Sequence, residues 1–148
     1  MTARVDVTRN TANTAQVAAL LTACDQDFSP PLSDRQDIAD YATRICNRAE
    51  RFEHWAAGTL AGLVAIYCIT PPGRPAFITN VSVRTDHRGR GIADTLLSAA
   101  IVHATSRGFD SIALEVDAHA SAARRLYAKH GFRPAPVAGS TDLFELKL

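Results

Sequence analysis

A short segment rich in glycine and arginine constrains the fold of this chain most, because it joins a strand-like run to a helical pattern. The segment His87–Ala93 reads His-Arg-Gly-Arg-Gly-Ile-Ala and follows the apolar, β-branched run Pro75–Arg84. Apolar residues then recur at helical spacing over Ile92–Ala104. A strand, a glycine loop and a helix in this order bring successive backbone N–H groups to one point, where an anion can bind. Arg88 and Arg90 add positive charge beside it.

The spacing within this loop excludes two common nucleotide-binding loops. A Walker loop requires Gly-Lys-Ser/Thr, whereas Ile92 and Ala93 follow Gly91 here. A Rossmann loop requires a small residue three positions after Gly91, where this chain has Asp94, and it follows the first strand rather than a later one. The loop therefore predicts a phosphate or pyrophosphate site of another kind. Taken alone, the pattern also fits a glycine loop with solvated arginines and no ligand. The motifs around the loop must distinguish these two interpretations.

The first third of the chain predicts one strand and two helices. The alternation over Arg4–Thr8 is typical of a strand, and Asn10 or Thr11 can cap the helix that follows. The prolines of Phe28–Leu32 predict a loop, because proline lacks the N–H donor and disfavours a helix before it. A capping-box pattern then predicts one helix over Ser33–Ala49.

The rest of the chain alternates between strand and helix patterns. The expected elements are strands at Phe52–Ala56, Leu60–Ile69 and Pro75–Arg84, a helix from Ile92, a strand at Ser111–Val116, a helix at Ser121–His130, and strands at Arg133–Val137 and Leu143–Leu148. This order predicts a single domain, residues 1–148, of the α/β class. We expect a mixed, mostly antiparallel twisted sheet with helices on both faces.

Charge and hydropathy exclude several classes of function. The chain has 148 residues, and its 16 Lys and Arg against 15 Asp and Glu leave a net charge of +1. This balance lacks the basic excess of nucleic-acid-binding proteins, so no nucleic acid partner is expected. No apolar run approaches the roughly 20 residues that cross a bilayer, and the first ten residues lack the apolar core of a signal peptide. No membrane association and a cytoplasmic location are therefore expected.

Cysteine and histidine spacing predicts no metal site. Cys24, Cys46 and Cys68 form no Cys-x-x-Cys pair, so free thiols are expected. The five histidines show no His-Glu-x-x-His spacing. We expect no metal in the function of this chain.

Four separate motifs, in a consistent order and at consistent distances, point to one known family. They are Val81–Val83, the Arg-x-x-Gly-x-Ala pattern of Arg88, Gly91 and Ala93, the strand residues Leu114–Val116, and Leu126–Phe132. Over Ala76–Arg133 the chain resembles the GNAT superfamily of acyl-CoA N-acyltransferases. The resemblance implies the single-domain GNAT-type fold, and acetyl-CoA as the acyl donor.

The same resemblance implies a cofactor site along one strand and the glycine loop. In the family, backbone N–H groups corresponding to Gly89–Asp94 bind the pyrophosphate. Pantetheine pairs with the exposed backbone of Val81–Val83, where an amide can also hold the acetyl carbonyl. An asparagine that commonly contacts the cofactor is Ala120 here, which leaves His119 or Ser121 to replace it. The implied cofactor-binding residues are Val81, Ser82, Val83, Arg88, Gly89, Arg90, Gly91, Ile92, Ala93, Asp94 and Ser121.

Two residues are candidates for acid and base catalysis by resemblance. Tyr127 stands where the family places a phenol near the thioester sulfur, and is the candidate general acid for the leaving thiolate. Glu115, twelve residues earlier, corresponds to the glutamate base of ribosomal-protein alanine N-acetyltransferases. A structural role for Glu115 stays open, with Glu53, His54 or a bound water as the other candidate bases.

The predicted activity is transfer of the acetyl group to a primary amine of a small molecule, such as an amino sugar or a polyamine-like amine, by direct attack. Asp25, Asp27 and Asp34 beside Phe28 favour a cationic acceptor. A protein N-terminal acetyltransferase is the first alternative, although the short link at Ala138–Asp142 lacks the tyrosine-bearing loop of that branch. A non-catalytic acyl-CoA-binding module is the second alternative. The sequence leaves open whether the chain forms a homodimer.

Overall fold

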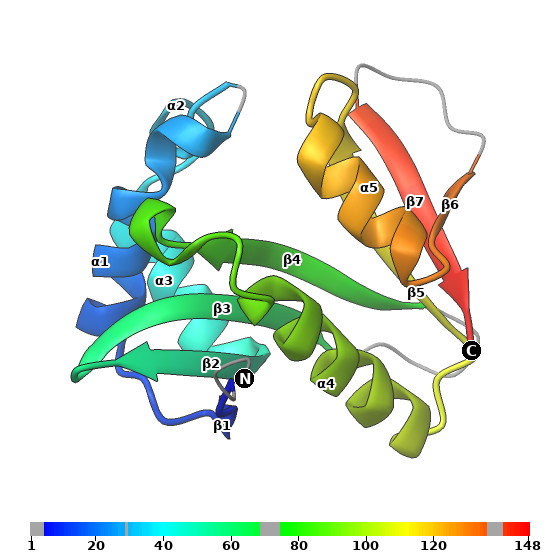
Figure 1. The fold of residues 1–148 in the computed structure, drawn as a ribbon, viewed down its shortest axis with the longest axis horizontal. Helices are drawn as coiled ribbons and strands as arrows, with labels where there is room; N and C mark the ends of the chain where they lie inside the picture. Colours follow the sequence, from blue (N-terminus) through cyan, green and yellow to red (C-terminus); the bar gives the residue numbers. More distant parts are fainter. Residues whose placement is uncertain (1–4, 29, 69–74, 136–140) are drawn as a thin grey trace.

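The computed structural model describes residues 5–28, 30–68, 75–135 and 141–148. Its helices and strands build one seven-stranded sheet in the order β1-β2-β3-β4-β5-β7-β6 (Figure 1). The elements are β1 (Thr8–Arg9), α1 (Thr14–Ala23), η1 (Asp25–Asp27), α2 (Leu32–Arg35), α3 (Ile38–Arg48), β2 (Glu50–Ala56), β3 (Thr59–Tyr67), β4 (Ala76–Val83), η2 (Thr85–His87), α4 (Ile92–Ser106), β5 (Ser111–Asp117), α5 (Ser121–Lys129), β6 (Arg133–Ala135) and β7 (Thr141–Lys147).

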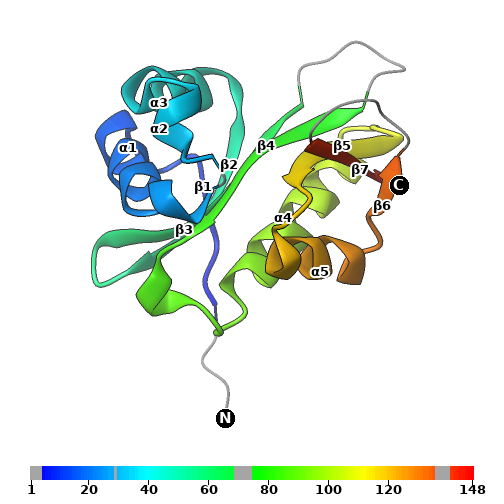
Figure 2. The same ribbon diagram turned by 90° about the horizontal axis from the view of Figure 1, so that it is seen from above.

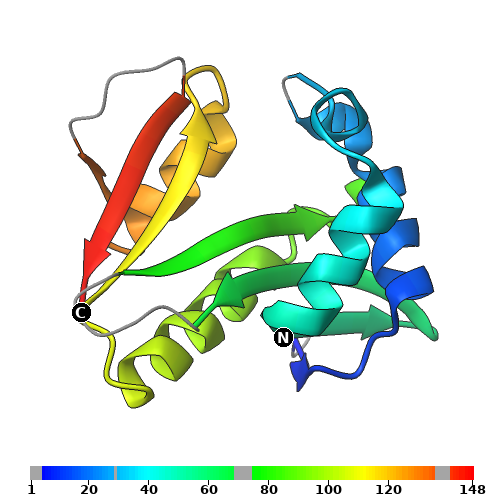
Figure 3. The ribbon, with the colours of Figure 1, turned by 180° about the vertical axis from the view of Figure 1, so that it is seen from behind.

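Helices cover both faces of this sheet. The pair β4–β5 is parallel and the other neighbouring pairs are antiparallel. Helices α1 and α3 pack on one face over a cluster of buried residues, Val17, Leu20, Leu21, Tyr41, Ala42, Ile45, Leu60, Leu63 and Ala65. Helices α4 and α5 pack on the other face over a second cluster, Val64, Ile66, Ile78, Leu96, Leu97, Ile112, Leu114, Tyr127, Phe132 and Phe144 (Figure 3). The predicted fold class is confirmed.

The first strand and helix cap differ from their predicted positions. Strand β1 is shorter than the predicted strand Arg4–Thr8, and residues 1–4 lie outside the described residues. Helix α1 is capped by Asn13 rather than by Asn10 or Thr11. The Asn13 side chain accepts the Gln16 N–H, and the Gln16 side chain accepts the Asn13 N–H, both at 2.9 Å. The side chains of Asn10 and Thr11 bind to β2 instead, so the helix begins later.

Glu53 of β2 is fully buried and holds the segment before α1 against the sheet. Its carboxylate accepts hydrogen bonds from the Thr8 hydroxyl (3.0 Å), from the Thr11 N–H and hydroxyl (2.9 and 2.6 Å) and from the Ala12 N–H (2.9 Å). The Arg51 Nε lies 3.5 Å away. A buried charge needs such partners, and their number makes Glu53 a structural residue.

The predicted helix over Ser33–Ala49 is divided into α2 and α3. The backbone is extended at Gln36 (φ −164°, ψ 159°), and the Asp37 side chain then caps α3. Ser33 is not an N-cap, because its N–H and its hydroxyl both donate to the Asp25 carboxylate at 2.7 Å. The partner of Ser33 lies eight residues away, which a local capping pattern does not reveal.

The remaining elements lie within a few residues of their predicted bounds. The predicted strand ends at Ile69 and Val137 lie outside the described residues, as does most of the link Ala138–Asp142. Cys24 and Cys68 are buried and Cys46 is half-buried, and all three are free thiols. Across the described ranges, no helix combines the length and apolar composition of a membrane span, and no three His, Cys, Asp or Glu side chains are grouped to hold a metal ion.

Gly62 of β3 allows α4 to lie close to the sheet. A Cβ at this position would lie 2.6 Å from the Cγ2 of Ile92 and 3.3 Å from the Cδ1 of Leu96. The Ile92 methyl is attached directly to Cβ and cannot swing aside, so Gly62→Ala is expected to displace α4. We expect the free energy of unfolding in urea to fall by about 1–3 kcal/mol. The double variant Gly62→Ala/Ile92→Ala should cost less than the sum of the single variants, and additive costs would contradict the clash.

Candidate active site

Strands β4 and β5 separate part-way along their length. They pair at Ala76–Ile112, Phe77–Ala113 and Ile78–Leu114, and at no later position. Beyond these pairs β4 continues to Val83 and β5 to Asp117, and the two ribbons diverge (Figure 2). The edge of β4 that faces β5 therefore has no strand partner over its second half. The separation that the sequence resemblance implies is present.

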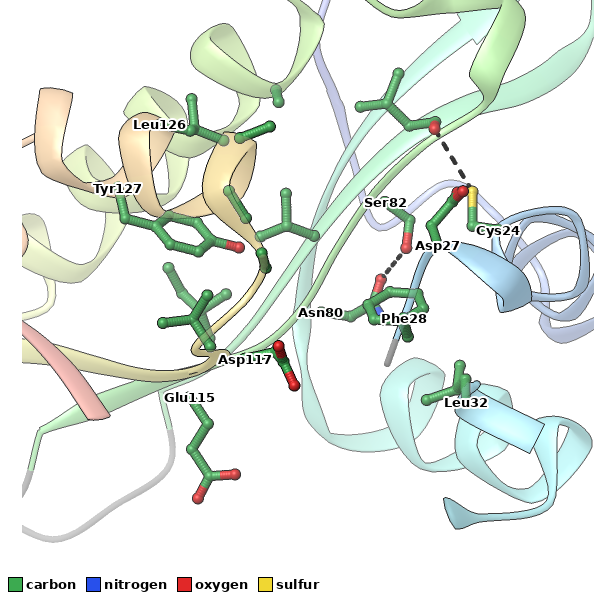
Figure 4. A pocket seen from close by; sticks show the side chains of 18 of the residues that line it. Cys24, Asp27, Phe28, Leu32, Asn80, Ser82, Glu115, Asp117, Leu126 and Tyr127 are labelled. Carbon is green, nitrogen blue, oxygen red and sulfur yellow. Dashed lines mark hydrogen bonds between the residues drawn. The ribbon is translucent and has the colours of Figure 1, made fainter. Parts of the chain in front are cut away.

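The separation opens into a cleft of about 770 Å³. One wall is the free half of β4 with the glycine loop, and the opposite wall is the end of β5 with α5 (Figure 4). The segment from α1 to α3 borders the cleft beside β4. Arg90 is the one predicted site residue that does not line the cleft, and those that do are Val81, Ser82, Val83, Arg88, Gly89, Gly91, Ile92, Ala93, Asp94, Glu115, Ser121 and Tyr127.

The glycine loop presents unused donors to this cleft. Gly89 and Gly91 have φ of 78° and 77°, in the left-handed region that glycine adopts without strain. Gly91 is the N-cap of α4, so the first-turn N–H groups of the helix point out of its N-terminus. Among the described residues, the main-chain N–H groups of Gly89–Asp94 donate to no protein acceptor. Free donors at the positive end of a helix dipole suit a phosphate group.

The two arginines of the loop already have partners in the protein. Arg88 forms an ion pair with Asp27 of η1, and its Nε donates to the main-chain oxygen of Val83 at 3.3 Å. The Nη1 of Arg90 lies 3.4 Å from the Nδ1 of His87. Arg88 is thus held in an ion pair, whereas Arg90 has no acidic partner among the described residues but does not line the cleft, so the main-chain N–H groups are the free donors that face the cleft.

Asp94 connects the first turn of α4 to the end of α5. Its carboxylate lies 2.9 Å from the Nε2 of His130 and 3.1 Å from the Nζ of Lys129. Partial burial raises the pKa of this carboxyl, but the hydrogen bonds from His130 and Lys129 outweigh burial and lower its pKa. The Lys129 ammonium offsets the negative charge that would otherwise repel an anion at the loop.

Tyr127 brings a protonated hydroxyl to the opposite wall. Its ring is buried and lies edge-on to Phe132, with centroids 6.0 Å apart. The hydroxyl points into the cleft (Figure 4). Burial raises the pKa of Tyr127 to about 12, so the phenol keeps its proton at neutral pH. A group of this kind can donate a proton to a leaving thiolate.

Two carboxylates of β5 reach the cleft from the other face of the sheet. Glu115 and Asp117 are two residues apart and so share one face, whereas Leu114 and Val116 pack in the cluster under α4 and α5. Within the described part of the chain neither carboxylate has a basic partner, although Asp117 accepts the His119 N–H at 2.7 Å. Glu115 points away from the phenol in Figure 4. Asp117 lies outside the motifs that carry the family resemblance, although its position two residues after Glu115 indicates the shared face.

Comparison with known proteins identifies the family. Residues 16–132 match the acetyltransferase (GNAT) family. The chain belongs to this family. The sequence resemblance to GNAT proteins is therefore confirmed.

Known GNAT proteins resemble the chain in sequence and in structure. The uncharacterized N-acetyltransferase YycN of Bacillus subtilis is 36% identical over 72 residues, which cover 49% of this chain and 46% of that protein. The chain spans about half the length of the curated relatives it matches. The PaiA N-acetyltransferase of Thermoplasma acidophilum, solved in complex with coenzyme A, superposes with a TM-score of 0.75 at 15% identity, over 97% of this chain and 100% of that one. The ribosomal-protein-S18-alanine N-acetyltransferase of Escherichia coli superposes with a TM-score of 0.70 at 23% identity, over 95% and 91% of the two chains.

The alternative bases of this GNAT chain are not in the cleft. Glu53 is bound to the segment before α1, and the Nδ1 of His54 lies 2.9 Å from the main-chain oxygen of Asp6. Both residues belong to β2, which is separated from β4 by β3. The hypothesis that either side chain is the general base is therefore wrong.

The acidic residues expected to attract a cationic acceptor are not free carboxylates of the cleft. Asp25 binds Ser33, Asp27 binds Arg88, and Asp34 does not line the cleft. This segment borders the cleft with the apolar side chains of Phe28 and Leu32 and the ring of Tyr41, and also with the polar side chains of Asp27, Arg35 and Gln36. Among the described carboxylates that line the cleft, Asp27 and Asp94 have basic partners and those of β5 do not.

The start of α5 lacks the side-chain cap that an asparagine would supply. Ala120 is the N-cap residue and makes no side-chain capping bond. His119 and Ser121 both line the cleft beside it and are exposed. A contact of either side chain with the cofactor stays a prediction.

Proposed function

We propose that this GNAT chain transfers the acetyl group of acetyl-CoA to a primary amine of a cationic small molecule, and that residues 1–148 do so as one domain. The observation that carries the proposal is the cleft, which joins three features in one channel. These are the free N–H groups of the glycine loop, the unpaired edge of β4 and the hydroxyl of Tyr127. Membership of the acetyltransferase family and the N-acetyltransferase relatives support it.

The donor half of the proposed site is built from main-chain groups. The pyrophosphate binds the N–H groups of Gly89–Asp94, and pantetheine extends along Val81–Val83 with strand-like hydrogen bonds. An N–H of this strand holds the acetyl carbonyl and stabilises the negative charge that develops on its oxygen. The likeness in fold to an N-acetyltransferase solved with coenzyme A supports this donor.

The reaction is a direct transfer between the two substrates. The neutral amine attacks the thioester carbon, a C–N bond forms and the C–S bond breaks. Glu115, directly or through water, takes the proton that the bound ammonium loses before it attacks, and the thiolate takes a proton from Tyr127 while the new amide nitrogen releases its second proton to water. The raised pKa of Tyr127 keeps the phenol protonated at neutral pH, as a general acid must be before it donates.

The surroundings of the acceptor end support a cation with an apolar body. Glu115 and Asp117 supply two negative charges without basic partners among the described residues, and Phe28, Leu32 and Tyr41 supply apolar surface on the opposite wall. Amino sugars and polyamine-like amines both carry such charges. A protein N-terminus is the second candidate acceptor, favoured by the glutamate at position 115 and the likeness in fold to a ribosomal-protein alanine N-acetyltransferase.

A thiol-release assay with an acceptor panel tests this proposal. The panel contains a diamine, an amino sugar, a peptide with an N-terminal alanine and an amine that carries a carboxylate. We expect the highest kcat/KM with the cationic small amines and little release with the acidic amine. A preference for the peptide would identify a protein acetyltransferase. Calorimetric binding of acetyl-CoA without thiol release for any amine would identify a non-catalytic binding module.

Replacing Glu115 by glutamine tests the proposed base. Glu115→Gln is expected to lower kcat about 10- to 100-fold at pH 7, and the loss should shrink as the pH approaches the pKa of the amine, because the free amine then needs no base. The side chain is exposed, so the melting temperature should not change.

The matched control for this measurement is Asp117→Asn, the same change two residues away. It is expected to raise KM for the acceptor while leaving the pH profile of kcat as in the wild type. An equal loss at every pH in Glu115→Gln, together with a lower melting temperature, would make Glu115 structural and leave water as the base.

A further inference from the structure

The point at which β4 leaves β5 coincides with a bulge in β4. On β3, Ala65 pairs with Asn80 and Ile66 pairs with Ile78, so Thr79 has no partner there. The last pair between β4 and β5 involves Ile78, the residue just before the bulge. A bulge adds one residue to a strand, bends it and turns its carbonyl out of the ladder.

Tyr41 of α3 binds the main chain of this bulge. Its hydroxyl lies 2.6 Å from the main-chain oxygen of Thr79 and 2.7 Å from the Thr79 hydroxyl. Because a carbonyl only accepts, the phenol donates its single proton to the Thr79 carbonyl. Burial raises the pKa of Tyr41, and hydrogen bonds with the side chains of Thr79 and Asn80 oppose this. Tyr41 is 4% exposed and Thr79 is half-buried, so these bonds form at the inner edge of the cleft.

The polar contacts continue from the bulge along the wall of the cleft. Asn80 and Ser82 are buried polar residues of β4 that line the cleft, and the Ser82 hydroxyl donates to the Asn80 side-chain oxygen at 2.6 Å (Figure 4). The contact of Tyr41 with the bulge and the Asn80–Ser82 pair therefore lie next to each other, between α3 and the strand segment proposed to bind pantetheine.

The register of this segment depends on the extra residue. If Thr79 entered the β3 ladder, every later residue of β4 would shift by one position and change face. Asn80 and Ser82 would then point toward α4, and Val81 toward α3. An unpaired carbonyl in a partly buried position costs free energy, so a donor stabilises the bulge. Among the described residues, Tyr41 supplies the side-chain donor to this carbonyl.

We infer that Tyr41 is a positioning residue: by holding the Thr79 carbonyl it sets where β4 turns away from β5, and so aligns the N–H groups of Val81–Val83 with pantetheine and the acetyl carbonyl. The inference rests on the proposed function for its effect on catalysis. Tyr41 acts through the main chain of β4 and not by contact with the reacting atoms.

The test compares Tyr41→Phe with Thr79→Val. Tyr41→Phe removes the donor and keeps the packed ring, whereas Thr79→Val removes the hydroxyl contact and keeps the carbonyl bond. We expect Tyr41→Phe to raise the Kd of acetyl-CoA about tenfold and to lower kcat by a further factor of about ten, and Thr79→Val to stay within about threefold of the wild type. The Kd of 3′-phosphoadenosine 5′-diphosphate, which has the pyrophosphate but no pantetheine, should not change.

Hydrogen exchange of the free protein provides a readout that needs no ligand. The amides of Asn80–Val83 should exchange faster in Tyr41→Phe than in the wild type, while those of β2 should not. Amide exchange in Tyr41→Phe equal to that of the wild type would overturn the inference. So would a Kd of acetyl-CoA and a kcat equal to those of the wild type, whether or not the melting temperature of the variant falls. If the wild type bound neither acetyl-CoA nor the diphosphate, the proposed function would fail, and faster exchange in Tyr41→Phe would still support the contact with the bulge.

Discussion

A Tyr127→Phe variant is expected to bind acetyl-CoA as the wild type does and to turn over roughly 100- to 1000-fold more slowly. The change removes one hydroxyl that points into the cleft and keeps the ring that packs against Phe132. Thiolate departure then proceeds without a proton donor. Stopped-flow or steady-state thiol release measures kcat, and calorimetry measures the affinity.

The chain contains a matched control for this substitution. Tyr67 of β3 is half-exposed and does not line the cleft, so Tyr67→Phe makes the same chemical change elsewhere. Its kcat should equal that of the wild type. Wild-type turnover of Tyr127→Phe with a true acceptor would refute the acid role, and a parallel loss of affinity would indicate a binding role instead.

The pKa of Tyr127 also predicts how stability depends on pH. Its folded value of about 12 is raised above the ordinary value near 10, so the neutral phenol is favoured in the folded state. The associated stability is fully present below pH 10 and is lost as the pH rises toward 12. Relative to Tyr127→Phe, the wild type should lose about 2–3 kcal/mol over this interval, since one pKa unit corresponds to about 1.4 kcal/mol. Urea unfolding at pH 9 and at pH 11.5 measures the difference, and a constant difference would contradict the burial of an ionisable phenol.

The second large effect is expected at the glycine loop, where Gly91→Glu should weaken acetyl-CoA binding about a thousandfold. A carboxylate about 4 Å from a phosphate repels it by about 4 kcal/mol near a protein surface. The φ of 77° at Gly91 adds strain of roughly 1–2 kcal/mol for any residue with a Cβ. Acetyl-CoA should therefore no longer raise the melting temperature of this variant.

Two control variants separate charge from strain in this experiment. Gly91→Ala has the strain without the charge, and should bind acetyl-CoA less tightly by about tenfold or less. Gly58→Glu places the same residue at nearly the same φ, 79°, in the β2–β3 hairpin, and should leave the affinity unchanged. Unchanged affinity in Gly91→Glu would show that the cofactor phosphates lie elsewhere.

Motifs that act through the local backbone were predictable from the sequence. The loop from His87 to Ala93 was located between a strand and a helix, because glycine at positive φ and a helical pattern are both local properties. The strands and helices after Phe52 were predicted to within a few residues for the same reason. The expected group of cleft residues followed from the GNAT resemblance, and the structure brings all of them except Arg90 to one cleft.

Errors arose where a side chain has a partner far away in the chain. Ser33 looks like an N-cap, but Asp25 takes its donors across eight residues. Glu53 looks available as a base, but the segment before α1 surrounds it across more than forty residues. In both cases the local sequence pattern describes what the side chain could do in an isolated peptide. In the folded chain, a hydrogen bond to a distant residue gives the side chain a structural role instead.

The amino-acid sequence by itself determined the order of the elements, the two-faced sheet and the anion loop, since these depend on hydrophobic period and backbone preference. The tertiary structure alone decided which carboxylates lack a basic partner, and where β4 separates from β5. Asp27 is neutralised by Arg88, while Glu115 and Asp117 have no cation within the described residues. The separation begins at Thr79, whose carbonyl is held by Tyr41 across 38 residues. Ion pairs and the position of the bulge in β4 depend on which residues, distant in the sequence, come into contact. Those contacts form only when the chain packs into its tertiary structure.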